Sequence, residues 1–252
     1  MVALAELVAY ADDLLEVGLF QDYCPNGLQV EGRNDVRRLA AGVTASQRLV
    51  DAAAARAADI LLVHHGYFWK GEDPCVTGMK RRRLAALIRA DVSLLAYHLP
   101  LDAHREFGNN AQLAQVLGFV AEGQFGPGPG PKIGWFGRLA APLSATELAA
   151  RIAHRLARAP LHLGGERGLI RRVGWCTGAA QSYLEQAADL GLDAFVSGEV
   201  SEQTTHVVRE RGIHFFAAGH HATERYGVQA LGRHLAERFG LDYEFLDIDN
   251  PV

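Results

Sequence analysis

Histidines and carboxylates gather directly after three predicted strands of this chain, and both residue types bind divalent metals. The clusters are His64-His65, His98 with Asp102, and His220 with Glu224. Neutral imidazole and carboxylate are common ligands of transition metals. Strand ends of an α/β protein open into the crevice where ligands bind. The three clusters together predict a metal centre that holds two ions.

His64 and His65 are adjacent and close the apolar run of residues 61–63 just before Gly66. On a regular strand, neighbouring side chains point to opposite faces. Because the chain turns at a strand end before glycine, both rings can face a common cavity, and one such geometry gives each histidine its own ion. The alternative is a hydrogen-bonded pair of histidines near a surface turn.

Asp102 follows His98 in a short segment that Pro100 stiffens. A carboxylate can ligate or bridge divalent metals, whereas His98 can ligate, donate a proton or support a ligand from behind. The alternative is that Asp102 caps the next helix. Asn109 and Asn110 stand closer to that helix and are better caps, which favours the ligand interpretation.

Glu224 lies four positions after His220, so on a helix the two side chains meet on one face. His221 would point elsewhere, either behind the ligands or into solvent. The alternative for Glu224 is first-turn charge that complements the helix dipole. The combined set of nitrogen and oxygen ligands, without sulfur, suits Zn, Mn, Fe, Ni or Co and does not select among them.

Further polar and aromatic residues lie beside these clusters. Glu199 and Glu202 flank another predicted strand end and can serve as acid, base or polar wall. Residues 67–69 (Tyr-Phe-Trp) follow His65, and they either stack on a ring of a ligand or pack their own loop.

Strands and helices alternate along the chain, which is typical of an α/β fold with mainly parallel sheets. The predicted strands are 39–43, 60–63, 92–97, 133–139, 173–177, 194–197, 214–218 and 243–246. The predicted helices are 3–17, 47–57, 80–89, 110–117, 144–157, 182–190, 202–211 and 223–239. Residues 123–132 contain repeated Gly-Pro pairs and predict a linker between an N-terminal lobe, 1–124, and a C-terminal lobe, 132–252.

The two predicted lobes resemble divergent copies of one unit. Gln47 is followed twelve residues later by Asp59 and a strand, and Gln181 is followed at the same spacing by Asp193 and a strand. Two similar lobes would place their strand ends around one shared cleft. Two unrelated βαβ units can also produce this spacing, because such units have similar lengths.

Composition sets the class of protein. The chain has 252 residues, is 49% hydrophobic and carries a net charge of −4, so nucleic acid is not its default partner. The run Lys-Arg-Arg-Arg at 80–83 is an exception that favours a solvated helix face. Three distant cysteines argue against a disulfide framework, and no apolar run is long enough to span a membrane. We expect a cytoplasmic protein without membrane partners.

Several longer segments resemble the YbgI-like proteins, the Nif-three-like family also called GTP cyclohydrolase I type 2 homologues. The matching segments are 64–71, 97–104, 108–110, 197–203 and 218–225. The resemblance implies two-lobed α/β subunits that assemble into a toroidal homohexamer, a trimer of dimers, with a dinuclear metal site in the cleft of each subunit. The implied ligands, with Glu224 bridging and with His98 and Glu199 close by, are His64, His65, Asp102, His220 and Glu224. One departure is His221, where many relatives have an aromatic residue.

Two functions remain open. The first is a metal-dependent hydrolase of a nucleotide, possibly GTP, or of another small polar substrate, with metal-activated water as nucleophile and His98 or Glu199 moving protons. The second is a ring-shaped metal-binding or assembly protein, such as a metallochaperone or a binder of DNA or protein. The chain lacks the cysteine that a cyclohydrolase I zinc site would use, and it has no GxGxxG or Walker lysine.

Overall fold

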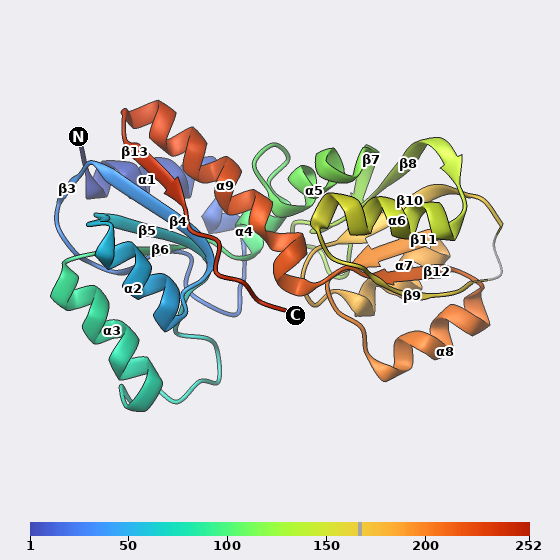
Figure 1. Ribbon diagram of the computed structural model, residues 1–252, viewed down its shortest axis with the longest axis horizontal. Coiled ribbons are helices and arrows are strands. Elements are labelled where there is room, and N and C mark those ends of the chain that lie inside the picture. Colours follow the sequence, from blue (N-terminus) through green and yellow to red (C-terminus); the bar gives the residue numbers. More distant parts are fainter. Residues whose placement is uncertain (166–167) are drawn as a thin grey trace. The chain divides into compact units, whose positions relative to one another are not determined.

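The computed structural model describes residues 1–165 and 168–252, which form two compact units (Figure 1). Unit 1 comprises Met1–Gly108 and Gly227–Asp249, and unit 2 comprises Asn109–Tyr226 and Asn250–Val252. These bounds differ from the predicted lobes, because the chain passes from unit 1 to unit 2 at Gly108 and returns inside the long helix α9, His220–Phe239.

Unit 1 is built on a five-stranded sheet in the order β13-β4-β5-β6-β2. Its strands are β2 (Gly27–Val30), β4 (Arg38–Thr44), β5 (Ile60–His65), β6 (Ser93–Ala96) and β13 (Asp242–Phe245). All neighbours are parallel except β2, which runs antiparallel to β6. A two-stranded ribbon joins β1 (Val2–Ala3) to β3 (Asp35–Val36). The sheet of unit 1 is therefore mainly parallel, as the alternating pattern predicts.

Helices cover both faces of this sheet, which explains its continuous apolar strands. The helices are α1 (Leu4–Leu14), η1 (Val17–Leu19), α2 (Gln47–Ala55), α3 (Gly78–Ala90), α4 (Leu99–Ala103) and the second part of α9. Leu62 packs with α1 and α9 on one face, while its neighbours Leu61 and Val63 pack with α2 and α3 on the other. This alternation is the two-residue period of a strand.

Unit 2 has a six-stranded sheet in the order β7-β8-β10-β11-β12-β9. Its strands are β7 (Phe119–Phe125), β8 (Gly134–Leu143), β9 (Leu161–Leu163), β10 (Ile170–Cys176), β11 (Ala194–Ser197) and β12 (His214–Ala217). The strands β10, β11 and β12 are parallel, whereas β7, β8 and β9 pair antiparallel with their neighbours. Among the described residues this sheet is mixed rather than mainly parallel.

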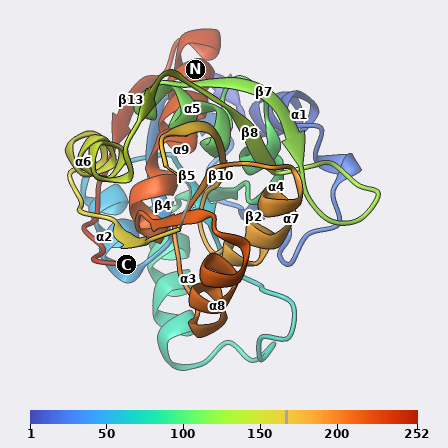
Figure 2. The same ribbon diagram turned by 90° about the vertical axis from the view of Figure 1, so that its right-hand side faces the viewer.

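Helices also cover both faces of the second sheet. They are α5 (Asn109–Leu117), α6 (Ala145–Leu156), η2 (Gln181–Tyr183), α7 (Leu184–Asp189) and α8 (Glu202–Arg211). Apolar residues of α5 and α6 pack into one core, and those of α7 and α8 pack into another on the opposite face. Figure 2 shows these four helices around the sheet. Helix α6 begins with a capping box, in which Ser144 and Glu147 satisfy each other's backbone N–H groups.

The Gly/Pro segment 123–132 has a different role from the predicted one. Its first residues complete β7, and the rest connects β7 to the antiparallel strand β8 within unit 2. So short a connection cannot contain a crossover helix, so the two strands form a hairpin. Glycine and proline thus mark a turn inside unit 2 and not a linker between units.

Asp59 and Asp193 make equivalent contacts in the two units. Asp59 Oδ2 accepts hydrogen bonds from the backbone N–H groups of Arg37 and Arg38 at 2.8 and 2.9 Å. Asp193 Oδ2 accepts the corresponding pair, from residues 171 and 172, each at 2.9 Å. Each aspartate fixes the start of one parallel strand beside the next, in β4 and β5 and again in β10 and β11.

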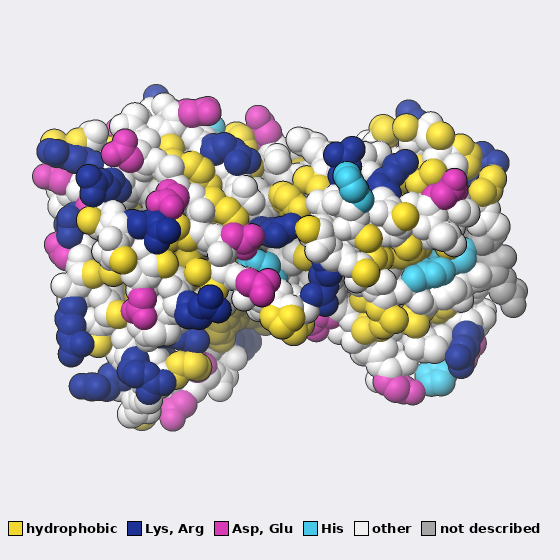
Figure 3. Space-filling model, viewed as in Figure 1, with side chains coloured by type: hydrophobic (Ala, Val, Ile, Leu, Met, Phe, Trp, Pro, Cys, Tyr) yellow, Lys and Arg dark blue, Asp and Glu magenta, His cyan; other side chains and the backbone are white. Residues whose placement is uncertain are grey.

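The surface carries mixed charge. Lys and Arg side chains are interspersed with Asp and Glu on the face shown in Figure 3. Arg81 and Arg82 of α3 are exposed, as the predicted solvated helix face requires. In the described part of the chain, the structure contains no helix whose length and apolar character would let it cross a lipid bilayer.

Candidate metal centre

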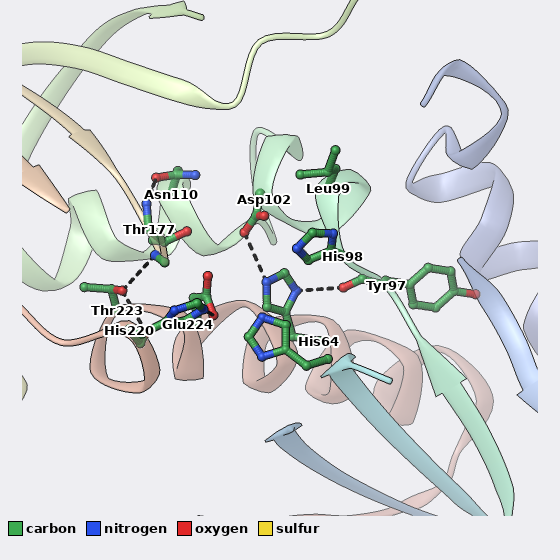
Figure 4. Close-up of polar contacts among 12 residues, drawn as sticks. His64, Tyr97, His98, Leu99, Asp102, Asn110, Thr177, His220, Thr223 and Glu224 are labelled. Atoms are coloured by element: carbon green, nitrogen blue, oxygen red, sulfur yellow. Dashed lines mark hydrogen bonds and ion pairs between the residues drawn. The ribbon is translucent and has the colours of Figure 1, made fainter. Parts of the chain in front are cut away.

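His64 is a fully buried imidazole at the end of β5 in unit 1, and its tautomer is fixed by the backbone (Figure 4). Its Nδ1 lies 2.8 Å from the carbonyl oxygen of Tyr97. Because a carbonyl only accepts, Nδ1 carries a proton, so Nε2 is the ring nitrogen that can ligate a metal. That Nε2 lies 3.5 Å from Oδ1 of Asp102.

His65 turns to the same side as His64, as the glycine turn at Gly66 allows. The two ring centroids are 4.5 Å apart, and Nδ1 of His65 lies 3.0 Å from Oγ1 of Thr44. The ring of His98 is 5.1 Å from that of His64 and 5.8 Å from that of His65. One nitrogen from each of the three rings lies within 4.8 Å of the others, so this cluster can hold a metal ion.

Asp102 reaches His64 from the short helix α4, which is formed by the segment that Pro100 stiffens. Pro100 stands in the first turn of α4, and the N–H of Asp102 donates to the carbonyl of His98 at 3.1 Å. The carboxylate is buried, 5% exposed, and contacts an imidazole. A buried carboxylate beside neutral imidazoles is the donor set that a divalent ion requires.

Aromatic residues after His65 divide into two roles. The side chain of Tyr67 is buried and its hydroxyl donates to the carbonyl of Ala45 at 2.8 Å, so it packs the loop. The indole of Trp69 lies 6.0 Å from the ring of His65 and meets the ring of His98 edge-on at 5.1 Å. Trp69 therefore borders the imidazole cluster.

Asp22 belongs to this cluster and was missed by the sequence analysis. Its Oδ1 lies 2.7 Å from Nδ1 of His98. Burial opposes ionisation of Asp22, but the hydrogen bond and charge of His98 outweigh it and hold the pKa of Asp22 below its usual value. Hydrogen bonds from Asn26 and Leu99 act in the same direction. No spacing rule points to Asp22, because it sits in a turn-rich loop far from His98 in sequence.

Unit 2 carries a second cluster at the start of α9 (Figure 4). Nε2 of His220 lies 3.0 Å from Oε2 of Glu224, one helical turn later, as the i, i+4 spacing predicts. Nδ1 of His220 lies 2.7 Å from Oε1 of Glu199. Glu224 is 3% exposed and His221 is buried, so the solvent-facing alternative for His221 is wrong.

Charge in the second cluster favours a proton on His220. Burial disfavours the charged form, but the hydrogen bonds and charges of Glu224 and Glu199 outweigh it and raise the pKa of His220 to about 9. A metal ion that bound here would replace this proton, because an imidazole ligates only in its deprotonated form. Two carboxylates around one imidazole are an electrostatic setting for a cation.

Glycines make room for these side chains. Gly178 adopts φ +67, and a Cβ at this position would collide with Oε1 of Glu224. A Cβ at Gly198 would lie 2.7 Å from Cα of His220. A buried network supports the same region, since Asn110 Oδ1 accepts from the N–H of Thr177 at 3.0 Å.

Each unit thus brings together part of the predicted set. His64, His65, His98 and Asp102 gather in unit 1, and Glu199, His220 and Glu224 gather in unit 2. Glu202 lies apart in α8, where its exposed carboxylate pairs with the exposed His206 at 2.9 Å. Within each unit the nitrogen and oxygen donors fit a divalent metal.

A mixed α/β chain with histidine–carboxylate clusters at its strand ends defines a candidate metal-binding protein, and comparison supplies its family. The family model described as Duf34/NIF3 (NGG1p interacting factor 3) matches residues 2–251. This chain belongs to the Duf34/NIF3 family.

Relatives match along their full length. A Pseudomonas aeruginosa protein named GTP cyclohydrolase 1 type 2 homolog is 57% identical over 251 residues, which cover 100% of this chain and 99% of the relative. The solved structure of protein ybgI, described as of unknown function, has a TM-score of 0.96 at 50% identity, with 100% of both chains covered. A crystal structure of a Thermus thermophilus protein has a TM-score of 0.89 at 36% identity, again with 100% of both chains covered.

Proposed function

We propose that this protein binds two divalent metal ions and acts as a metal-dependent hydrolase of a nucleotide or another small polar substrate. The observation that carries the proposal is the pairing of imidazole with a buried carboxylate in each unit, as in His64 with Asp102 and His220 with Glu224. The full proposed ligand set, with Glu224 as the bridging ligand, is His64, His65, Asp102, His220 and Glu224.

Residues of the chain orient the proposed ligands without a bound metal. The Tyr97 carbonyl holds Nδ1 of His64, so Nε2 is the nitrogen that would ligate. The Glu199 carboxylate holds Nδ1 of His220, and a metal would replace the proton of that ring. Bound divalent ions would activate water for hydrolysis near neutral pH. His98 would move the proton, because its ring lies beside His64 and His65 while Asp22 holds its other nitrogen. Glu199, expected to share that role, is better placed to orient His220.

The names of relatives agree with a nucleotide substrate. The Pseudomonas aeruginosa relative and its counterpart in Escherichia coli K12, 51% identical over 248 residues, are both named GTP cyclohydrolase 1 type 2 homolog. Hydrolysis of a purine ring suits an activated water and a nearby proton carrier. GTP is therefore the first substrate to test.

A second candidate function is partner binding, with the metals as cargo or as regulatory ligands. The family description, NGG1p interacting factor 3, names a protein interaction and favours this candidate. We propose that the protein assembles into a toroidal homohexamer, a trimer of dimers, in the cytoplasm. Under this second function metal binding and partner capture occur without turnover.

Metal content per subunit, measured on protein purified without chelator, tests the site. We expect about two ions in the native protein and fewer in Glu224→Ala and in Asp102→Ala. The matched control is Glu202→Ala, which removes an exposed carboxylate of the same unit as Glu224. Absence of metal in the native protein, with none taken up from Zn, Mn or Fe, would exclude both functions.

Hydrolysis separates the two functions. Native protein loaded with metal is offered GTP and other nucleotides, and product formation is compared with that of Asp102→Ala at equal protein concentration. Turnover that disappears in the variant supports the hydrolase. Metal binding with no turnover on any nucleotide supports the binding protein.

A further inference from the structure

The loop between η1 and β2 contains Asp22, a carboxylate outside the proposed ligand set. Both of its oxygens accept hydrogen bonds. The side chain of Asp22 is 3% exposed. Its Oδ1 accepts from Nδ1 of His98 at 2.7 Å and from the N–H of Tyr23 at 2.6 Å. Its Oδ2 accepts from Nδ2 of Asn26 at 2.8 Å and from the N–H of Leu99 at 2.9 Å. Four donors complete the capacity of a carboxylate.

These contacts make Asp22 a poor metal ligand, even though Cys24 and His98 lie near enough to form a three-residue group with it. An ion would have to displace at least one of the four donors. Burial of Cys24, together with the charge of Asp22, raises the pKa of the thiol to about 12, so the thiol stays protonated. A metal at this group would therefore have to displace the thiol proton as well as one of the donors to Asp22. We therefore expect Asp22 to act through His98.

His98 is held at both its backbone and its ring by the same loop. Its N–H donates to Oδ1 of Asn26 at 2.7 Å, and its Nδ1 donates to Asp22. An ionised carboxylate accepts only, so Nδ1 of His98 carries a proton, and Nε2 is the ring nitrogen that does not contact Asp22. The ring lies beside His64 and His65, with the edge of Trp69 against it.

We propose that Asp22 is a positioning residue, which holds a proton on Nδ1 of His98, so that in the neutral ring the proton acceptor is Nε2, beside the imidazoles of His64 and His65. The use of that acceptor in hydrolysis rests on the proposed function. The tautomer itself does not, because it follows from contacts within unit 1 that need neither metal nor substrate.

The variant Asp22→Asn should reverse which nitrogen of the His98 ring carries the proton. In the variant, the amide oxygen should take the place of Oδ2, because Asn26 and Leu99 both donate hydrogen bonds there. The amide nitrogen then faces His98, and only the imidazole can change from donor to acceptor. The variant should convert His98 to the Nε2–H tautomer, while the exposed N–H of Tyr23 turns to water.

The test is nitrogen NMR of the histidine rings in isotopically labelled, metal-free protein, with His98 assigned through His98→Gln. We expect a protonated Nδ1 in the native protein and the reversed pattern in Asp22→Asn. The matched control is Asn26→Ala, which removes bonds to the same loop but keeps Asp22 against His98, and its ring should keep the native pattern. A native His98 already protonated at Nε2, or the same tautomer in native protein and Asp22→Asn, would overturn the proposal.

Metal content gives the second readout. Because His98 lies outside the proposed ligand set, Asp22→Asn should retain its metal, whereas Glu224→Ala should lose it. Metal loss in Asp22→Asn equal to that in Glu224→Ala would overturn the assignment of His98 as an acceptor beside the ligands. Failure of the proposed function, with no metal and no turnover in the native protein, leaves the NMR result unchanged, so the two failures are distinguishable.

Discussion

The carboxylate of Glu199 accepts a hydrogen bond from Nδ1 of His220 at 2.7 Å, and this contact determines which nitrogen of the ring faces Glu224. The same pairing occurs in unit 1, where Asp22 meets Nδ1 of His98. In His220, which belongs to the proposed ligand set, such a pairing orients the ring and makes it more basic, which would strengthen its bond to a metal. Each unit therefore contains one imidazole whose direction is set by a carboxylate behind it.

Glu199→Ala should weaken metal binding about 10–100-fold without removing a ligand. The reason is that His220 loses the partner that fixes its tautomer and ring orientation. Competition with a chromophoric chelator measures the dissociation constant of the native and variant proteins. Glu202→Ala serves as the control, since that carboxylate is exposed and pairs with the exposed His206. Equal affinities for Glu199→Ala and the native protein would show that the contact has no influence on the site.

Tyr97→Phe should lower the free energy of unfolding by about 1–3 kcal/mol. Tyr97 is fully buried, and its hydroxyl donates to Oδ1 of Asp12 at 2.7 Å. Burial raises the pKa of Asp12, although the hydrogen bond from Tyr97 opposes that rise. The variant leaves the carboxylate without its donor in a partly buried setting. Urea unfolding measures the change, and Tyr23→Phe, at a ring that is 63% exposed, should change stability little.

Gly178→Ala should be more destabilising than Gly71→Ala, although both glycines have positive φ. Gly71 adopts φ +86 with nothing near its missing Cβ, so its variant reports backbone strain alone, about 1–2 kcal/mol. Gly178 adopts φ +67, and its Cβ would collide with Glu224, which adds about 1–3 kcal/mol of overpacking. Unfolding free energies of the two variants measure the difference. Equal losses would mean that the space beside Glu224 is not restricted.

Stability should depend on the ionisation of Asp22 in acid. The pKa of Asp22 is lowered in the folded protein, so the unfolded chain binds its proton more readily. Its contribution is then fully present above the ordinary pKa of an aspartate, about 4, and is lost as the pH falls through the folded value. The loss of stability in Asp22→Asn should therefore be larger at about pH 5 than at about pH 2.5.

The comparison for that pH series is Asp249→Asn, at an exposed carboxylate whose variant should show no such trend. A stability difference between native protein and Asp22→Asn that stays constant across the series would contradict the assignment of an ionised, hydrogen-bonded Asp22.

Local patterns in the sequence predicted most of the elements and most of each cluster. The apolar run before His64 identified a buried strand, and the spacing of His220 and Glu224 predicted a shared helix face. Asp22 was not predictable, because its partner is 76 residues away and the contact depends on how the loop between η1 and β2 folds. Local periodicity carries no information on such long-range contacts.

The bounds of the two units were the second feature that could not be predicted from the sequence. The Gly-Pro pairs at 123–132 break regular structure, but a turn within a sheet and a linker between units have the same composition. Assigning residues 227–249 to unit 1 depends on tertiary packing, in which Leu231 and Leu235 join the core of α1 and β5. Helical periodicity continues through Tyr226 and Gly227 and gives no sign of the division.

The division of α9 has a consequence for any attempt to dissect the protein. A fragment that ends at Gly108 would lack the residues of α9 that cover one face of the first sheet and the edge strand β13 that pairs with β4. Leu62 and Leu95, fully buried in the intact chain, would then lose part of their cover. Unit 1 is encoded in two pieces on either side of unit 2, so no single cut of the polypeptide liberates it whole. Its complement, residues 227–249, would have to be supplied in trans.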